Sequence, residues 1–172
     1  MAEAILESPI GPLYAVASAT GLQRLEFVRG ASALERGSFG NSDAASEAII
    51  AETQKQLTEY FDGERREFDI PLEPTGSDFQ MRVWRAIAGI PYGEVLSYAD
   101  LAMAAGSPGA FRAAGTACGN NQISILIPCH RIVASGGRIG GYGGGLGTKV
   151  NLLRLEGSLA GLKGVQPALA LA

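Results

Sequence analysis

The first half of the chain alternates between short apolar runs and turn signals. Three such runs, separated by SPIGP and ATG, are typical of antiparallel strands: ILES, LYAVAS and LQRLEFV. From about Ser46 to Phe61 the apolar residues recur at near-helical spacing, and Asp62-Gly63 supplies a stop signal. The pattern predicts a hairpin or three-stranded antiparallel sheet covered by one helix.

Helical patterning dominates the second half. Two capping-box signatures, at Ser77 and Ser97, open helices that end near Gly89 and at Gly106. Ser107-Pro108 then supplies an N-cap and a first-turn proline for a third helix, which ends at residues 119–121. Two short helices across a glycine-containing turn indicate a helix-turn-helix, although any small helical domain can contain such a pair.

These patterns predict an α+β fold in two parts. We expect a small N-terminal domain of antiparallel sheet and helix, with its connecting segment, over residues 1–76, and a mostly helical C-terminal domain over residues 77–172. Residues 1–77 hold six Lys and Arg against thirteen Asp and Glu, a net −7, whereas residues 78–172 hold eight against four, a net +4. A polyanion would therefore bind the second domain, although acidic residues that merely solvate the first half explain the charge equally well.

Composition excludes several classes of protein. No apolar run approaches the ~20 residues of a membrane span, and the N-terminus has no signal-peptide pattern, so we expect a cytoplasmic protein without a membrane partner. Two cysteines, Cys118 and Cys129, and the single histidine His130 are too few for a disulfide framework or a structural zinc site. We expect two free thiols and no metal.

The stretch ILIPCHRIV carries the candidate chemistry. It sets Cys129 between Pro128 and His130, inside a run that otherwise resembles a buried strand. A thiol has a reference pKa of ~8.5, and an adjacent base is one way to generate the thiolate nucleophile. Neighbouring strand residues point to opposite faces, so a contact between this cysteine and histidine requires a bend, which Pro128 favours, or a bridging water. The dipeptide alone leaves a buried inert thiol and an activated nucleophile both open.

The third predicted helix has almost no side-chain bulk on its surface. Its small residues are Ala110, Ala113, Ala114, Gly115, Thr116 and Ala117. Because glycine inside a helix costs ~1 kcal/mol relative to alanine, we expect something to approach closely, either another helix or the walls of a DNA minor groove. Phe111 and Arg112 are the long side chains that could project into such a groove.

Five segments, in this order and spacing, resemble the O6-alkylguanine-DNA alkyltransferase family: SYADLA, GSPGAFRAAGTACGNN, ILIPCHRIV, GGYGGG and KVNLLRLEG. The resemblance covers residues 77–157 closely and the first half, through SPIGPL, more loosely. It implies a DNA-repair methyltransferase that needs no cofactor. Such a protein binds double-stranded DNA through the minor groove, flips out an O6-alkylguanine and moves the alkyl group irreversibly onto its own cysteine, in a single turnover.

The resemblance also implies roles for individual residues. Cys129 would be the alkyl acceptor, His130 the base acting on it through a water, and Glu156 the group that holds the imidazole. Asn121 would stabilise the turn at the acceptor, and Tyr98 would donate its phenolic proton as guanine leaves.

Further positions follow from the same resemblance. Arg112 would fill the vacated base stack, and Phe111 would strengthen this wedge or pack inward. The rest of the DNA-binding surface and the substrate pocket would comprise Ala113, Gly115, Thr116, Tyr142, Gly143, Ile132 and Pro128. Gly143 stands where some relatives carry serine, which predicts a roomier pocket, while Arg131 is expected to be structural rather than catalytic.

Two other classes of function stay open. A noncatalytic protein that binds alkylated lesions would share the fold, but such relatives replace the acceptor, and this chain has Cys129. A Cys-His hydrolase or thiol redox protein would need turnover of a small substrate or a resolving thiol. We expect a monomer with little dependence on base sequence, and leave cooperative binding along DNA open.

Overall fold

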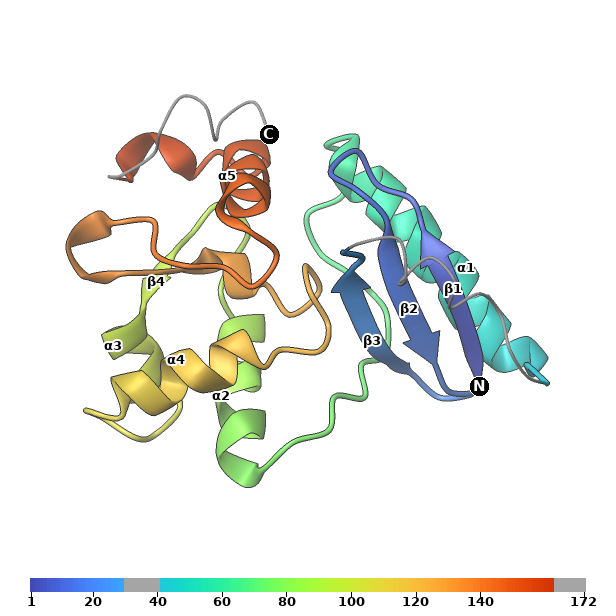
Figure 1. The fold of residues 1–172 in the computed structure, drawn as a ribbon, viewed down its shortest axis with the longest axis horizontal. Helices are drawn as coiled ribbons and strands as arrows, with labels where there is room; N and C mark the ends of the chain where they lie inside the picture. Colours follow the sequence, from blue (N-terminus) through green and yellow to red (C-terminus); the bar gives the residue numbers. More distant parts are fainter. Residues whose placement is uncertain (30–40, 163–172) are drawn as a thin grey trace. The chain divides into compact units, whose positions relative to one another are not determined.

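The computed structural model describes residues 1–29 and 41–162, and the chain divides into two compact units (Figure 1). Unit 1 comprises Met1–Thr75 with Gln122–Ser124, and unit 2 comprises Gly76–Asn121 with Ile125–Ala172. One unit contains a sheet and a helix and the other is mainly helical, which confirms the predicted α+β fold. No helix within the described ranges is both long and apolar enough to cross a membrane.

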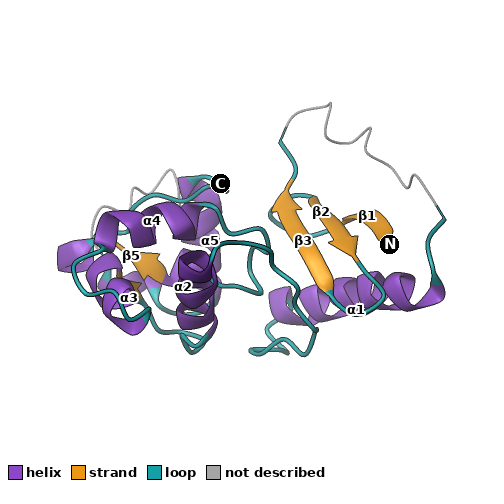
Figure 2. Ribbon diagram, turned by 90° about the horizontal axis from the view of Figure 1, so that it is seen from below, coloured by secondary structure: helices purple, strands orange, loops and turns teal. Residues whose placement is uncertain are grey.

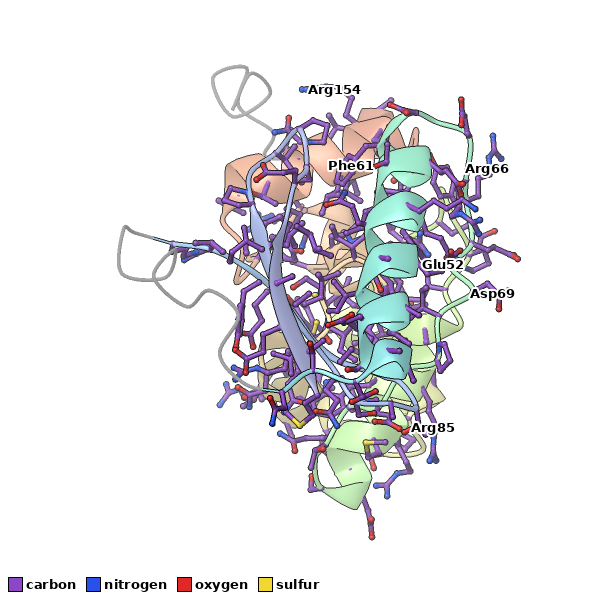
Figure 3. The ribbon with its side chains drawn as sticks, turned by 90° about the vertical axis from the view of Figure 1, so that its right-hand side faces the viewer. Glu52, Phe61, Arg66, Asp69, Arg85 and Arg154 are labelled. Atoms are coloured by element: carbon purple, nitrogen blue, oxygen red, sulfur yellow. The ribbon has the colours of Figure 1, made fainter. Side chains whose placement is uncertain are left out.

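In the described part of unit 1, a three-stranded antiparallel sheet has one helix along it (Figure 2). The strands β1 (Ala2–Leu6), β2 (Leu13–Ala17) and β3 (Leu22–Phe27) pair in sequence order, and α1 (Ala44–Phe61) packs against β1 and β2. In Figure 3, α1 runs alongside the strands. Apolar side chains of α1 and of the strands are fully buried together, so the predicted sheet and helix share one core: Leu13, Leu22, Leu25, Leu57 and Tyr60.

Three residues from far along the chain extend this sheet. Leu25 donates its N–H to the Gln122 carbonyl at 2.8 Å and accepts from the Ser124 N–H at 2.8 Å. The Gln122 side chain also pairs with the backbone of Thr75. Gln122–Ser124 therefore belongs to unit 1, a grouping that local sequence patterns did not indicate.

The described residues of unit 2 form four α-helices, three short 3-10 helices and one short pair of strands. Its elements are α2 (Asp78–Ala88), β4 (Leu96–Ser97), α3 (Tyr98–Ala104), α4 (Phe111–Gly119), η2 (Cys129–Arg131), β5 (Ile132–Val133), η3 (Ser135–Gly137), α5 (Leu146–Leu155) and η4 (Leu159–Gly161). The predicted capping box at Ser77 is present, and Ser97 caps α3 through the Asp100 N–H. Trp84 of α2 donates its indole N–H to the Ala117 carbonyl at 2.8 Å, which ties α2 to α4.

The predicted start of the third helix is wrong. Helix α4 begins at Phe111 with Ala110 as its N-cap, and no side chain caps it. Ser107 and Pro108 instead open a turn, in which the Ala110 N–H donates to the Ser107 carbonyl at 3.1 Å and Gly109 has φ +85°. Proline followed by a glycine with positive φ is typical of a type II turn, so this dipeptide ends one segment instead of capping the next.

Candidate active site

The cysteine-histidine pair lies on a tight turn. Residues 125–133 are buried as predicted, but only Ile132–Val133 forms a strand, and Cys129–Arg131 is a single turn of 3-10 helix. The Arg131 N–H donates to the Pro128 carbonyl at 2.9 Å and so closes the turn. The expectation of a strand through this cysteine is wrong, and the bend expected at Pro128 is confirmed, because a turn frees the two side chains from the alternation of a strand.

The sulfur of Cys129 is nearly enclosed and receives polar contacts. Its residue is 8% exposed, and Asn121 donates from Nδ2 to Sγ at 3.2 Å and to the Ile127 carbonyl at 2.8 Å. The neighbouring Cys118 thiol lowers the pKa of Cys129, burial opposes this, and the Asn121 amide and the Lys149 ammonium lower the pKa further. A lower pKa raises the share of the thiolate, which is the nucleophilic form.

His130, Arg131 and Glu156 form one buried network. The Glu156 carboxylate accepts from Arg131 Nε and Nη2 at 2.8 Å each and contacts His130 Nε2 at 3.0 Å. Burial acts to raise the pKa of Glu156, but the hydrogen bonds from Arg131 and His130 outweigh it and hold the pKa at about 2. Arg131 also donates from Nη1 to the Ile90 carbonyl at 2.6 Å, which agrees with its expected structural role.

The imidazole of His130 is held in one orientation and in its neutral form. Its side chain is fully buried, burial lowers its pKa, and contact with Glu156 opposes this only in part. An ionised carboxylate can only accept, so Nε2 carries the proton of the neutral ring and Nδ1 carries the lone pair. Within residues 1–29 and 41–162, no protein group hydrogen-bonds this Nδ1.

Lys149 is a site residue that the sequence reasoning missed. It lies on α5, is fully buried, and donates from Nζ to the carbonyls of Ile132 at 2.6 Å and Gly141 at 3.0 Å. Burial lowers the pKa of Lys149 to about 8, although the negative charges of Cys118 and Cys129 act to raise it. The sequence did contain a signal. Positions 149, 153 and 156 lie on one face of the helix, and Leu153 on that face is buried, so a lysine there is not an ordinary solvated surface residue.

One face of helix α4 is buried. The opposite face is exposed and carries mostly small side chains, and we call it the bare face. Ala114, Ala117 and Cys118 are buried, and α4 packs against α2 and α3. Phe111 is 49% exposed, so its side chain does not pack fully inward. The other exposed residues of α4 are Arg112, Ala113, Thr116 and Gly119, while Gly115 is half-buried.

A pocket of about 390 Å³ opens beside this face, lined by Tyr98, Ala99, Phe111, Gly115, Ala134 and Ser135. Burial raises the pKa of Tyr98, and the charges of Cys118 and Cys129 raise it further. A Cβ added at Gly115 would lie 3.5 Å from the Tyr98 ring, an ordinary contact distance. Tyr98 thus forms a wall of the pocket beside Gly115 of α4.

The remaining predicted pocket residues are Pro128, Ile132, Tyr142 and Gly143. Pro128 is its buried N-cap, and the carbonyl of buried Ile132 accepts from Lys149. Tyr142 is half-buried, and a Cβ added at exposed Gly143 would meet nothing within 4 Å. A serine would therefore fit at position 143.

Comparisons with known proteins agree over nearly the whole chain. Residues 1–74 match the 6-O-methylguanine DNA methyltransferase, ribonuclease-like domain, and residues 78–158 match the 6-O-methylguanine DNA methyltransferase, DNA binding domain. A methylated-DNA--protein-cysteine methyltransferase of Methanosarcina acetivorans is 42% identical over 90% of this chain and 97% of its own length. One of Mycobacterium tuberculosis is also 42% identical, over 90% of this chain and 92% of that relative.

A solved structure gives the same result for the fold. The crystal structure of Mycobacterium tuberculosis OGT in complex with DNA has a TM-score of 0.77 and 38% identity, and the match covers 98% of each chain.

Proposed function

Since the chain belongs to the 6-O-methylguanine DNA methyltransferase family and is a DNA-repair methyltransferase, we propose that Cys129 accepts the alkyl group of O6-alkylguanine. The observation that carries this proposal is the buried sulfur with the Asn121 amide at 3.2 Å and a lowered pKa. Displacement at an alkyl carbon suits a soft thiolate, and such a nucleophile must be charged at neutral pH.

The proposed step is a single displacement. The Cys129 sulfur attacks the alkyl carbon, a carbon–sulfur bond forms, and the bond from that carbon to guanine O6 breaks with its electron pair leaving on guanine. Tyr98 supplies the proton that neutralises the departing guanine, and its raised pKa keeps the phenol protonated until then. The product on the protein is a thioether, which resists hydrolysis, so each molecule acts once.

His130 takes the thiol proton before the displacement. Nδ1 has the lone pair and no protein partner among the described residues, so it is available to a water that reaches the sulfur. Glu156 fixes the ring through Nε2, and Arg131 keeps Glu156 ionised. This arrangement follows triad logic with cysteine as the nucleophile.

The bare face of α4 is the proposed DNA surface. Small exposed residues at positions 113 and 116 let the walls of the minor groove approach, and Arg112 fills the stack that a flipped guanine leaves. Half-exposed Phe111 adds an apolar wedge beside it. The pocket next to Tyr98 then receives the flipped base, with Gly143 leaving room for larger alkyl groups. We propose that one molecule acts alone on each lesion, in the cytoplasm.

The stoichiometry of repair tests the acceptor. Protein incubated with an excess of duplex carrying one O6-methylguanine gains a single methyl group per chain, measured as intact mass, and none with unmodified duplex. Cys129→Ser gains none. Repeated turnover by the wild type, or methylation of Cys129→Ser, contradicts the proposal.

The flipping role of Arg112 has a separate test. Arg112→Ala lowers the rate with duplex about tenfold or more, equal to at least about 1.4 kcal/mol of the cost of extruding a base. Its rate with the free base O6-methylguanine stays unchanged, since no base has to be flipped. Arg85→Ala, which removes the same charge from the exposed side of α2, is the matched control. Equal losses with duplex and free base contradict the role.

A further inference from the structure

A tight turn between α2 and β4 lies against the buried network of the site. It spans residues 91–94, and the Glu94 N–H closes it by donating to the Pro91 carbonyl at 3.1 Å. Gly93 has φ +84°, and a glycine with positive φ at the third position is typical of a type II turn. The turn therefore holds the backbone of Tyr92, at its second position, in a defined conformation.

Three contacts join this turn to the network. The Tyr92 hydroxyl donates to the Leu155 carbonyl at 3.1 Å, and Leu155 is the last residue of α5, directly before Glu156. The Tyr92 ring centroid lies 5.8 Å from the guanidinium carbon of Arg131, within reach of a cation–π contact. A Cβ added at Gly93 would lie only 3.2 Å from the Glu156 carbonyl oxygen, so the turn and the end of α5 are in close contact.

We propose that Tyr92 is a positioning residue for alkyl transfer, whose ring and hydroxyl hold Arg131 and the end of α5, and through them the carboxylate that orients the His130 imidazole. The inference rests on the proposed function, because it takes His130 as the base that removes the Cys129 proton. It gives a part in the chemistry to a residue that acts only through its neighbours.

The Glu156 carboxylate makes the placement of His130 depend on Arg131. One oxygen, Oε2, accepts from Arg131 Nη2 at 2.8 Å and contacts His130 Nε2 at 3.0 Å. A shift of the guanidinium or of the end of α5 would therefore move the partner of the imidazole. Tyr92 contacts both, and it is half-buried beside side chains that are almost fully enclosed, so it also shields the network from water.

The groups around His130 set the direction of the test. Burial lowers the pKa of His130, Glu156 at the end of α5 acts to raise it, and Arg131 of the same turn and Lys149 of α5 lower it further. Loss of Tyr92 admits water and loosens the guanidinium, whereas Lys149 keeps its own two carbonyl partners. Because burial is the largest of these influences, the pKa of His130 should rise.

Three variants separate positioning from stability. Tyr92→Leu removes the ring and the hydroxyl, Tyr92→Phe removes only the hydroxyl, and Tyr14→Leu, at a half-buried tyrosine of β2, is the matched control. His130 is the only histidine in the chain, so its titration midpoint can be measured from the imidazole NMR signals of the intact protein. The rate of methyl transfer from O6-methylguanine duplex, per folded molecule, is measured on the same samples.

A positioning role predicts that Tyr92→Leu raises the His130 midpoint by about half a pH unit or more and slows methyl transfer about tenfold. Tyr92→Phe should lie between Tyr92→Leu and the wild type in both measurements. Tyr14→Leu should keep the wild-type midpoint and rate even where it lowers stability. A folded Tyr92→Leu variant with the wild-type midpoint and rate overturns the inference.

A double substitution tests whether the effect passes through the histidine. In a His130→Gln background, Tyr92→Leu should change the remaining rate by less than about twofold, since the group that it positions is gone. A further tenfold drop, of about the size seen in the wild-type background, overturns the inference.

The remaining outcomes are also decisive. If Tyr92→Leu does not fold, Tyr92→Phe is compared with the wild type alone, and an unchanged midpoint and rate overturn the inference. If the midpoint shifts as expected but the wild type takes up no methyl group from DNA, the proposed function fails while the positioning of His130 by Tyr92 stands.

Discussion

The two units bury polar side chains in opposite ways. Unit 1 buries the neutral residues Ser46, Thr53 and Gln56, and unit 2 buries the ionisable residues His130, Arg131, Lys149 and Glu156. In unit 1 the partners lie closer in sequence: Ser46 donates to the Asp43 carbonyl, Thr53 to the Ile49 carbonyl, and Gln56 pairs with the backbone of Asp69, 13 residues away. In unit 2 the partners of Arg131 lie 25 and 41 residues away.

The two kinds of burial differ in their energetic cost. A buried hydroxyl with a backbone partner costs little, whereas a buried charge costs several kcal/mol unless it is paired and hydrogen-bonded. In unit 2, Lys149 acts on the pKa of Cys129, and Glu156, Arg131 and Lys149 act on the pKa of His130 next to it. Perturbed pKa values of this kind cluster at functional sites.

The largest effect is expected from breaking the buried network. Glu156→Gln removes the carboxylate that pairs Arg131 and orients His130, and so leaves the guanidinium buried without its counter-charge. We expect a loss of about 3–5 kcal/mol in the free energy of unfolding, measured by urea denaturation, and loss of repair. Glu67→Gln, on an exposed position of unit 1, should change stability by less than about 0.5 kcal/mol. Similar losses in both variants would remove the contrast between the units.

Lowering the pH should weaken the same buried network without a mutation. Glu156 has a pKa of about 2 against an ordinary 4.5, and His130 has a pKa below 6.5. Both groups bind protons more weakly when folded, so their stabilisation is complete above their unfolded pKa values. This stabilisation decreases as the pH falls. The loss begins below pH 6.5 for His130. For the Glu156 carboxyl it runs from pH 4.5 toward pH 2 and amounts to about 3 kcal/mol in the free energy of unfolding.

Urea denaturation at a series of pH values measures this loss. His130→Gln should be less sensitive to pH between about 6.5 and about 5 than the wild type, since the group that titrates there is gone. An equal slope in the two proteins would show that another group causes the loss.

A smaller effect is expected at Lys149. Lys149→Met removes the donor to the Ile132 and Gly141 carbonyls but also relieves the burial of a charge, so the net loss of stability should be about 1–3 kcal/mol. Repair should slow because the ammonium no longer favours the Cys129 thiolate. Lys55→Met, on an exposed position of α1, is the control for losing a positive charge. Repair rates that match in the two variants would exclude an electrostatic role.

The smallest effect belongs to unit 1. Thr53→Val keeps the shape of the side chain and removes only its hydroxyl donation to the Ile49 carbonyl, which remains part of the α1 hydrogen-bond ladder. The expected cost is about 1 kcal/mol or less in the free energy of unfolding. The methyl-transfer rate per folded molecule should be unchanged, and a clear drop in that rate would mean that unit 1 contributes to the chemistry.

Local sequence patterns predicted the structural features that depend on residues close together in the chain. The three strands, the helix α1 and the caps at Ser77 and Ser97 follow from apolar spacing and side-chain to backbone hydrogen bonds within a few positions. The start of α4 was missed because Ser-Pro fits both an N-cap and a turn, and Gly109 decides for the turn.

The site was predicted as a set of residues but not as a network. The resemblance paired His130 with Glu156, and these two side chains are in contact. It did not indicate that Lys149 bonds two carbonyls or that Cys118 lies against Cys129, because both contacts arise only when α4 and α5 pack around the turn. Spacing along one helix can suggest a buried lysine, but its partners come from other segments.

The most direct measurement is the location of the transferred group. The protein is reacted with duplex that carries O6-methylguanine with a deuterated methyl, digested, and mapped by tandem mass spectrometry. The account predicts the label on Cys129 alone, as a thioether, in a yield equal to the lesion supplied when protein is in excess. Label on Cys118 or on any other residue, or lesion-selective binding with no label at all, would contradict it.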